Sequence, residues 1–325
     1  MELPRRCFLR VATCVVALPV LPRIASALDY PTRPVRIVVP TGPGGGYDVM
    51  GRLTAEQLGV RLGQNVFVEN RTGAGTIVGT QSVINSAPDG YTLLVGGLSN
   101  IVFNASLYHN APYDPLKQLV PVAIIYRLAY VVVASNEMPF NSVKDIIAAA
   151  KAKPGTLNVA TAGVGTGQQL TALAFMNATG TKMIEVPYKG ASAVYPDLMT
   201  GRVNLFFDTI TAAMPFVQSG KVKGLAILAP QRSKDLPDVP TMEEAGVRGL
   251  NVDSWIGLFA PAGTPKSTIE KLQEEIEAAA PQLKDKFADV GANYMWVPPD
   301  ELDGFVRAEY DKWTRLIKDA GIILE

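Results

Sequence analysis

Two glycine-rich turns are the parts of this chain whose residue types and spacing could bind a ligand. The first turn, residues 41–48, contains four glycines and follows the apolar residues 35–40, a pattern typical of a buried strand. Glycine allows positive φ angles and lets another atom approach the backbone closely. Asp48 is placed to cap the helix that follows, and the first N–H groups of a helix carry partial positive charge. This corner therefore favours the binding of an anion.

A second corner of the same kind occurs in the middle of the chain. Residues 157–161 form a short strand candidate, residues 162–167 contain three glycines, and an apolar run follows at residues 170–176. Two such corners in one chain favour two halves that face one ligand. The sequence leaves open the alternative that both are ordinary strand-to-helix turns of an α/β protein.

One acidic side chain is predicted at the edge of a sheet. Asp208 ends the apolar strand candidate at residues 203–207, and ligands of α/β sheets bind beyond the carboxyl ends of the strands. Its carboxylate could accept a hydrogen bond from a hydroxyl or an amine of the ligand. The alternative role is to cap the segment that follows.

Several kinds of catalytic and cofactor site are excluded by the residues present. His109 is the only histidine, and it lies in a predicted surface loop remote from both corners. We find no Ser–His–Asp arrangement, no cluster of metal ligands and no phosphate loop ending in Gly-Lys-Ser/Thr. Both glycine turns lack the third glycine of a dinucleotide fingerprint at the required spacing. We therefore expect no metal and no cofactor.

The N-terminus has the features of an export signal. Arg5 and Arg6 precede the apolar stretch at residues 11–20, and residues 25–27 are small enough for a cleavage site. Paired arginines are typical of twin-arginine export, and the general secretory route is the alternative. A retained membrane anchor is disfavoured, because the stretch is well short of the ~20 residues that a spanning helix needs. We expect a periplasmic mature chain that begins near Leu28.

The composition of the mature chain narrows the class of partner. Removing residues 1–27 takes away both cysteines, Cys7 and Cys14, so no disulfide is expected. The same segment carries four arginines and one glutamate, which leaves 26 basic and 29 acidic residues and a net charge of −3. A nucleic-acid surface would need a clustered basic excess, so nucleic acid is not an expected partner. The roughly 300 residues that remain are enough for two domains.

Strand-like and helix-like segments alternate from residue 35 to about residue 217, which is typical of parallel sheets covered by helices. Two apolar stretches could carry the chain between two domains. One is residues 120–133, which Tyr126 and Arg127 interrupt, and the other is residues 252–259.

With crossings at these stretches, the first domain is discontinuous. It comprises residues 28–128 and 251–325, and the second domain, residues 129–250, is inserted into it. Two connecting segments of this kind permit bending at a hinge.

A series of short motifs identifies a family that this chain resembles. Each motif is weak alone, but their order and spacing are specific, and they extend over nearly the whole mature chain. The chain resembles the extracytoplasmic solute receptors of the tripartite tricarboxylate transporters, also called the Bug family. The motifs are residues 30–40, 44–48, 69–75, 88–94, 186–190, 206–208, 236–241 and 260–265.

The resemblance implies an α/β protein with the type II fold of periplasmic binding proteins. Each of its two domains would hold a mixed sheet flanked by helices, with the ligand cleft between them. It implies a monomer without catalytic activity that closes on a small organic acid and delivers it to the membrane subunits of a tripartite tricarboxylate-type transporter. Similar proteins hold a ligand carboxylate with loop backbone groups and two bridging waters.

The resemblance also implies which residues bind the ligand, and these come from both domains. Thr166 is expected to give its hydroxyl and its N–H to the carboxylate. The implied ligand-binding residues are Gly45, Gly46, Tyr47, Asp48, Ala74, Gly75 and Ser99 in the first domain, and Thr161, Gly163, Gly165, Thr166, Gln168, Tyr188 and Asp208 in the second.

Some positions depart from the family pattern or have a second interpretation. Thr41 stands where many relatives carry Phe, and Tyr47 stands where they often carry Thr or Ser, so the shape of the ligand is expected to differ from that of dicarboxylate-binding relatives. Gln169 occupies a place where relatives often carry His. Asp48 could be a helix cap alone, and Lys189 is expected to be a solvated surface charge.

Two other functions compete with uptake of a solute. A sensory receptor would report the same ligands to a membrane kinase, and the sequence does not separate sensing from transport. An exported hydrolase would need a nucleophile with a base beside it, and no such pair is present.

Overall fold

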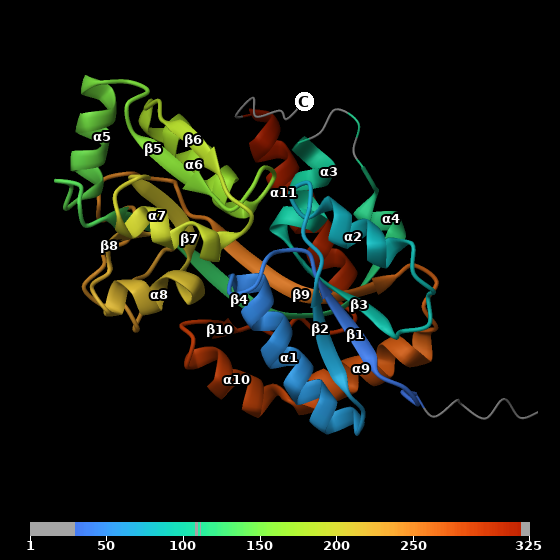
Figure 1. The fold of residues 1–325 in the computed structure, drawn as a ribbon. Helices are drawn as coiled ribbons and strands as arrows, with labels where there is room; N and C mark the ends of the chain where they lie inside the picture. The colour runs from blue at the N-terminus through green and yellow to red at the C-terminus, as the bar shows by residue number, and fades with distance from the viewer. Residues whose placement is uncertain (1–29, 108–109, 111, 320–325) are drawn as a thin grey trace, which may run out of the picture. The chain divides into compact units, whose positions relative to one another are not determined.

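The computed structural model describes residues 30–107, 110 and 112–319 of the 325-residue chain. The predicted export signal with Cys7 and Cys14, and the loop residue His109, lie outside the described residues. Residues 31–319 are arranged as two halves, each built of a sheet and the helices that cover it (Figure 1).

The first half contains a mixed sheet with three parallel strands and one antiparallel strand. Strands β2, β1 and β3 run parallel in that order, and β9 pairs with β3 in the opposite direction. The strands are β1 (Val35–Val39), β2 (Val66–Asn70), β3 (Thr92–Gly97), β9 (Asp253–Pro261) and the short β10 (Asn293–Tyr294). The helices are α1 (Gly46–Leu62), α2 (Ile77–Ile84), the π-helix η1 (Leu98–Phe103), α3 (Asn104–Leu107), α4 (Pro115–Gln118), α9 (Lys266–Ala278), α10 (Ala280–Ala288) and α11 (Leu302–Asp319).

The second half repeats this plan. Strand β5 pairs in parallel with β6 on one side and with β7 on the other, and β8 pairs with β4. The strands are β5 (Asn158–Thr161), β6 (Ile184–Pro187), β7 (Leu205–Thr209) and β8 (Val222–Ile227). The helices are α5 (Val143–Ala152), α6 (Gly167–Thr179), the 3-10 turn η2 (Ala191–Ala193), α7 (Tyr195–Met199) and α8 (Ile210–Gln218).

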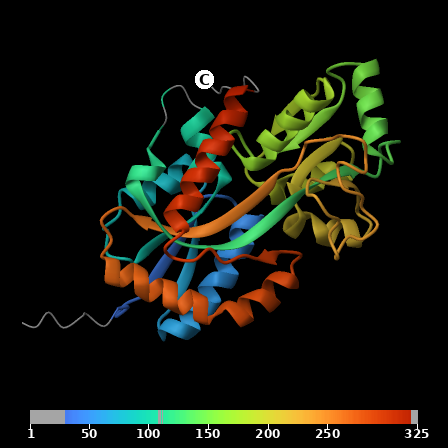
Figure 2. The same cartoon turned by 180° about the vertical axis from the view of Figure 1, so that it is seen from behind.

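Two long strands connect the halves. Strand β4 (Leu119–Ser135) pairs with β9 over Leu119 to Ala129 and with β7 from Tyr130 onward. Seen from behind in Figure 2, β4 and β9 lie side by side between the two halves. The crossings thus occur in the two predicted stretches, while the domain boundaries at residues 128/129 and 250/251 stay a prediction.

The expected interruption of β4 at Tyr126 and Arg127 is wrong. Tyr126 is fully buried, and its hydroxyl forms a 2.7 Å hydrogen bond with the hydroxyl of Thr211, whereas Arg127 is exposed. Successive side chains of a strand point to opposite faces, so one exposed arginine does not end a strand whose other face is buried.

Each half has its own hydrophobic core. In the first half Phe103, Trp255 and Phe259 pack together with residues of α11. In the second half Phe206 packs with Tyr195 and with residues of α8. Leu170 of α6 in the second half packs into the cluster of the first half, so the two cores meet at this helix.

Candidate ligand cleft

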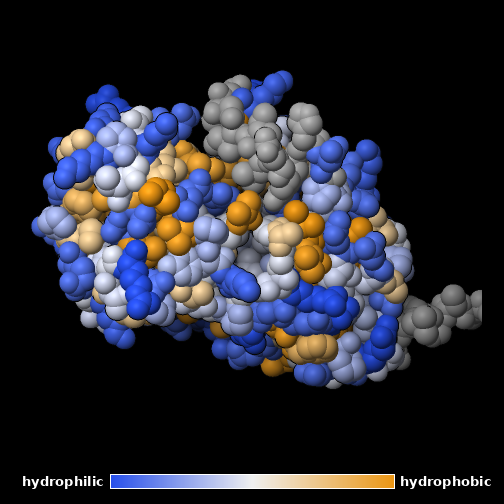
Figure 3. Space-filling view, turned by 45° about the horizontal axis from the view of Figure 1, so that its top comes forward, coloured by the Kyte–Doolittle hydropathy of each residue, from blue (hydrophilic) through white to orange (hydrophobic). Residues whose placement is uncertain are grey.

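A cavity of about 550 Å³ lies between the two halves. The first half lines it with residues 40–42, 45–47, 72–76 and Ser99. The connecting strand β4 contributes Tyr130. The second half contributes residues 162–164, 166, 168, 187–191 and 209. In the space-filling view of Figure 3, the surface around this region mixes hydrophilic, intermediate and hydrophobic residues.

Most of the predicted ligand residues line this cleft, although their contact with a ligand stays a prediction. The predicted residues that line the cavity are Gly45, Gly46, Tyr47, Ala74, Gly75, Ser99, Gly163, Thr166, Gln168 and Tyr188. The predicted residues outside the cavity lining are Asp48, Thr161, Gly165 and Asp208.

Other lining residues were not among the predicted ligand residues. Thr209 follows Asp208 at the end of β7, so the strand-end rule could have indicated it. Tyr130 lies inside the connecting strand, where no motif marks a functional residue. The lining residues outside the predicted set are Pro40, Thr41, Gly42, Thr72, Gly73, Thr76, Tyr130, Ala162, Val164, Pro187, Lys189, Gly190, Ala191 and Thr209.

Asp48 holds the first glycine turn in place and is itself buried. Its carboxylate accepts hydrogen bonds from the Gly44 N–H at 2.9 Å, from Arg52 Nε at 3.0 Å and from Asn70 Nδ2 at 2.8 Å. Burial alone would raise the pKa of Asp48, but the hydrogen bonds from Arg52, Gly44 and Asn70 outweigh it and lower the pKa. Gly45 is the N-cap residue, so Asp48 is neither the N-cap nor part of the cavity lining.

The loop at residues 72–76 has an unusual backbone. Ala74 and Thr76 have φ angles of 43° and 81°, in the left-handed region that non-glycine residues rarely adopt. Asn104 Nδ2 donates to the Gly75 carbonyl and to Thr76 Oγ1, each at 2.8 Å. Strained backbone of this kind persists where the surroundings hold it, and it concentrates at functional sites. At the start of this loop, Arg71 forms an ion pair with Glu69 at 3.1 Å.

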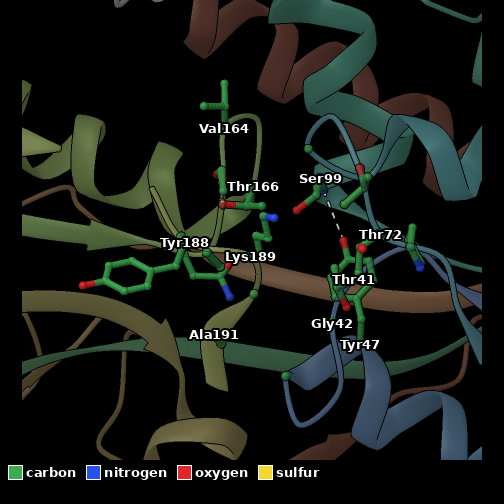
Figure 4. Close-up of a pocket in the computed structure, with 18 of the residues that line it drawn as sticks. Thr41, Gly42, Tyr47, Thr72, Ser99, Val164, Thr166, Tyr188, Lys189 and Ala191 are labelled. Carbon is green, nitrogen blue, oxygen red and sulfur yellow. Dashed lines mark hydrogen bonds between the residues drawn. The ribbon is translucent and has the colours of Figure 1, made fainter. Parts of the chain in front are cut away.

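Ser99 links Tyr47 of its own half to Gly167 of the other half. The Ser99 N–H donates to the Tyr47 hydroxyl at 3.2 Å, the dashed line in Figure 4. Ser99 Oγ accepts a 2.9 Å hydrogen bond from the N–H of Gly167, the first residue of α6 in the other half. Burial raises the pKa of Tyr47 to about 12, so its hydroxyl is protonated at neutral pH.

The second glycine turn is capped from within its own half. The Thr166 hydroxyl donates to the Gly163 carbonyl at 2.6 Å and accepts from the Gln169 N–H at 3.4 Å. The Gly165 N–H donates to Gln169 Oε1 at 2.7 Å. In this conformation the Thr166 hydroxyl and the Gly165 N–H are engaged in the turn and the helix cap, and their contact with a ligand stays a prediction.

Tyr188 contributes to the cleft differently from what the sequence suggested. Its hydroxyl donates to Asp197 at 2.8 Å, and Figure 4 shows its ring directed away from the other labelled lining residues. Tyr188 lines the cavity as predicted, but its hydroxyl is engaged by a carboxylate outside the cavity lining. Lys189 is exposed as expected, but it also lines the cavity.

Thr161 and Asp208 both lie beneath the surface of the second half. Thr161 is fully buried at the end of β5, and its hydroxyl has no hydrogen-bond partner among the described residues. Asp208 is fully buried near the end of β7, so it cannot touch a ligand as the sequence analysis expected. The strand-end rule predicted the correct edge of the sheet for Asp208, but it does not predict how deeply the side chain is buried.

The two halves are in direct contact around the cleft. Ser192 Oγ donates to the Pro43 carbonyl at 2.9 Å. A Cβ atom at Gly75 would overlap the carbonyl oxygen of Val164, and one at Gly42 would lie 3.1 Å from the carbonyl oxygen of Lys189. The structure therefore shows a closed arrangement of the halves, with backbone against backbone at the glycine turns.

The chemistry of the lining suits binding better than catalysis. Lys189 is the one lysine, arginine, aspartate or glutamate among the described lining residues. The described part of the chain holds no group of three or more His, Cys, Asp or Glu side chains that could bind a metal ion. Gly46 and Tyr47 lie in the first turn of α1, where backbone N–H groups have no acceptor within the helix.

Comparisons with known proteins agree with this geometry. The family model of the tripartite tricarboxylate transporter family receptor matches residues 50–322. The chain is 35% identical to the protein BugT of Bordetella pertussis over 318 residues, which cover 97% of this chain and 96% of that protein.

Two solved structures that resemble this one were obtained with small organic acids. "R. palustris Rpa4515 with adipate" has a TM-score of 0.87 and 32% identity, and the match covers 91% of this chain and 99% of that one. MatC from Rhodopseudomonas palustris with bound malate has a TM-score of 0.84 and 32% identity, covering 89% and 100% of the two chains.

These matches confirm the predicted family, the two-domain α/β fold of periplasmic binding proteins and a receptor in place of an enzyme. The chain belongs to the receptor family of the tripartite tricarboxylate transporters.

Proposed function

We propose that the cleft captures a small organic carboxylate and that the closed receptor delivers it to the membrane subunits of a tripartite tricarboxylate-type transporter. The observation that carries the proposal is the cavity of about 550 Å³, which both glycine turns line. Its size suits a small acid enclosed on several sides.

The electrostatics of the lining support an anionic ligand held mainly by neutral groups. Backbone N–H groups at the start of α1 point partial positive charge toward the cleft, and Lys189 adds one cation at its surface. The resembling structures with adipate and malate show that relatives bind acids of this size.

A ligand screen on protein stripped of carried-over ligand tests the proposal. A carboxylate at ~100 times its dissociation constant should stabilise the folded protein by about 2.7 kcal/mol. The screen should include mono- and dicarboxylates, aromatic acids and acidic amino acids, with the matching amides as uncharged controls. A panel without any thermal shift would contradict the proposal.

Export to the periplasm is part of the same proposal. Members of the family are periplasmic receptors, and the N-terminal segment has the residues of an export signal. No helix in the described part of the chain is both long and apolar enough to cross a membrane. The intact mass of the periplasmic protein should correspond to a chain that begins near Leu28, and a mass that retains Cys7 and Cys14 would contradict cleavage there.

A further inference from the structure

Asp208 is a buried carboxylate without a cationic partner, and it lies directly beneath the wall of the cleft. Its side chain accepts hydrogen bonds from the Tyr195 hydroxyl at 2.7 Å, from Gln168 Nε2 at 3.2 Å and from the Thr209 N–H at 2.8 Å. All three donors are neutral, and Asp208 forms no ion pair within the described residues. Two of these neighbours, Gln168 and Thr209, line the cleft.

The groups that surround Asp208 leave its charge uncompensated. Tyr195 on α7 and Tyr130 on β4 are the other titratable groups that interact with it, and burial raises the pKa of both phenols well above the usual value. Burial raises the pKa of Asp208 to about 6, so at pH 8 this carboxylate is ionised while both phenols are neutral.

The ionised carboxylate of Asp208 fixes the orientation of the Gln168 side-chain amide, and Gln168 lines the cleft. An ionised carboxylate can only accept hydrogen bonds, so the NH₂ group of the Gln168 amide must face Asp208. The carbonyl oxygen of the same amide accepts no hydrogen bond from the described residues. Because Gln168 lines the cavity, this oxygen is an acceptor that a ligand can satisfy.

A second carboxylate of a ligand is disfavoured at this position. It would bring acceptor oxygens toward an amide oxygen and toward the buried negative charge of Asp208. A hydroxyl or an ammonium group would instead donate to Gln168 and lie favourably in the same negative potential. A buried acceptor left without a donor is costly, so this contact discriminates between otherwise similar ligands.

We propose that Gln168, oriented by Asp208, selects acids that carry a hydroxyl or an ammonium group beside a carboxylate over acids that lack such a donor. The inference rests on the proposed function of the cleft and names the chemical class within it. Asp208 acts here as a positioning residue, because it touches the ligand only through Gln168.

Matched pairs of acids test the inference by calorimetric titration at pH 8. Succinate, malate and aspartate share a four-carbon chain and differ in the absence or presence of a hydroxyl or ammonium donor. Glutarate, 2-hydroxyglutarate and glutamate provide the same comparison at five carbons. In each series, the tighter-binding of the two acids with a hydroxyl or ammonium donor should bind the wild-type protein at least about tenfold more tightly than the acid without a donor. This factor corresponds to about 1.4 kcal/mol.

Two variants remove the selection in different ways. Asp208→Asn lets the Gln168 amide turn and present its NH₂ group, and Gln168→Met deletes the acceptor while the other two donors to Asp208 remain. In either variant the preference should shrink to less than about threefold. Glu137→Gln is the matched control. It removes one exposed carboxylate near Ser135, at the end of β4 remote from the cleft residue Tyr130, and should keep the wild-type preference.

The outcomes separate this inference from the proposed function. Equal affinities for both kinds of acid in the wild-type protein, or an unchanged preference in Gln168→Met, would overturn the inference while leaving carboxylate capture intact. A lack of binding by every acid, here and in the wider screen, would overturn both. If Asp208→Asn does not fold, Gln168→Met still decides the question.

Discussion

Asp48 in the first half and Asp208 in the second are both buried carboxylates at a strand-to-helix corner beside the cleft. Asp48 accepts hydrogen bonds from Arg52, and this cation contributes to a lowered pKa. Asp208 has only neutral donors, and its pKa is raised. The same residue type therefore fastens a loop in one half and keeps an uncompensated charge in the other.

The two walls of the cleft, one from each half, therefore have separate tasks. The first wall neutralises its own carboxylate and leaves backbone N–H groups to face an anion. The second wall places negative charge beneath Gln168, which favours a donor on the ligand. A ligand that is anionic at one end and a hydrogen-bond donor at the other fits this polarity.

The walls also differ in what they contribute to closure. Gly42 and Gly75 of the first half lie against the backbone carbonyls of Lys189 and Val164 in the second half. The glycines of the first wall therefore leave room that backbone carbonyl groups of the second wall occupy. Steric changes in the first wall should block closure, while charge changes in the second should alter selection.

The largest expected effect comes from Gly75→Ala. The added Cβ would overlap the carbonyl oxygen of Val164, and a backbone atom of the other half cannot move aside alone. The halves should stay apart, so ligand affinity should fall roughly a thousandfold, about 4 kcal/mol. Calorimetric titration and small-angle scattering with ligand measure the loss and the missing compaction.

Gly63→Ala is the matched control for Gly75→Ala. Gly63 has a φ of 62°, close to the 57° of Gly75, and an added Cβ there would meet nothing within 4 Å. The control carries the same backbone strain without a contact between halves. If both variants lose the same affinity, or neither does, closure through Gly75 is the wrong explanation.

The second effect concerns the pH dependence of stability. Between about pH 4 and pH 6 the folded state holds a proton on Asp208 that the unfolded state has lost, because the pKa of Asp208 is about 6 in the fold and 3.8 in the reference state. The Asp208 contribution to the free energy of unfolding should therefore fall as pH rises through this window, by roughly 3 kcal/mol, and stay constant above it.

Urea unfolding of wild type and Asp208→Asn from pH 4 to pH 7.5 isolates this contribution. Other carboxylates titrate in both proteins and cancel in the difference of the two unfolding free energies. The free energy of unfolding of Asp208→Asn should increase relative to that of the wild type as the pH rises from about 4 to about 6. A difference that is flat with pH would mean that Asp208 has an ordinary pKa.

The third effect is a loss of folding stability on substitution of Asp48, the buried carboxylate of the first wall, in contrast to the gain expected for Asp208→Asn. Asp48→Asn at pH 7 replaces a charged acceptor of three hydrogen bonds by an amide whose NH₂ group faces the donors of Arg52 and Asn70. The loss should destabilise the fold by about 2 kcal/mol, within the range for hydrogen bonds to charged groups. Urea unfolding at pH 7, with Glu137→Gln as the control, measures it. A stability equal to wild type would show that the partly exposed Arg52 contributes little.

The sequence predicted the positions of both corners because strand, glycine turn and helix leave strong local patterns. Residues 41–48 and 162–167 lie at the cleft, as their glycine content suggested. The two crossings were also predictable, since long apolar stretches between domain-sized segments have few other roles. What failed was the interruption at Tyr126, because one exposed neighbour does not break a strand buried on its other face.

Depth and side-chain direction could not be predicted in the same way. Thr166 has the residue type for either a ligand contact or a helix cap, and only the position of the Gly163 carbonyl decides for the cap. Asp208 was placed at the correct sheet edge, but its burial depends on Tyr195, which is thirteen residues earlier in the chain. Such choices are made by tertiary packing, which leaves no local pattern.

The smallest expected effect tests a contact between the walls that lies outside the cavity lining. Ser192 Oγ donates to the Pro43 carbonyl at 2.9 Å, and this bond joins the two halves at an exposed position. Because the bond exists only when the halves are closed, Ser192→Ala should weaken ligand binding without changing the stability of either half. A net hydrogen bond contributes about 0.5–1.5 kcal/mol, so affinity should fall two- to tenfold, and mainly through faster dissociation.

Ser219→Ala provides the matched control, because Ser219 Oγ also donates to a proline carbonyl, that of Pro215 at 2.6 Å, but within one helical segment of the second half. Its loss should leave affinity unchanged. Stopped-flow dissociation rates for both variants decide the point. If Ser192→Ala dissociates at the wild-type rate, water replaces the lost bond without cost, and closure depends on the glycine contacts and the ligand alone.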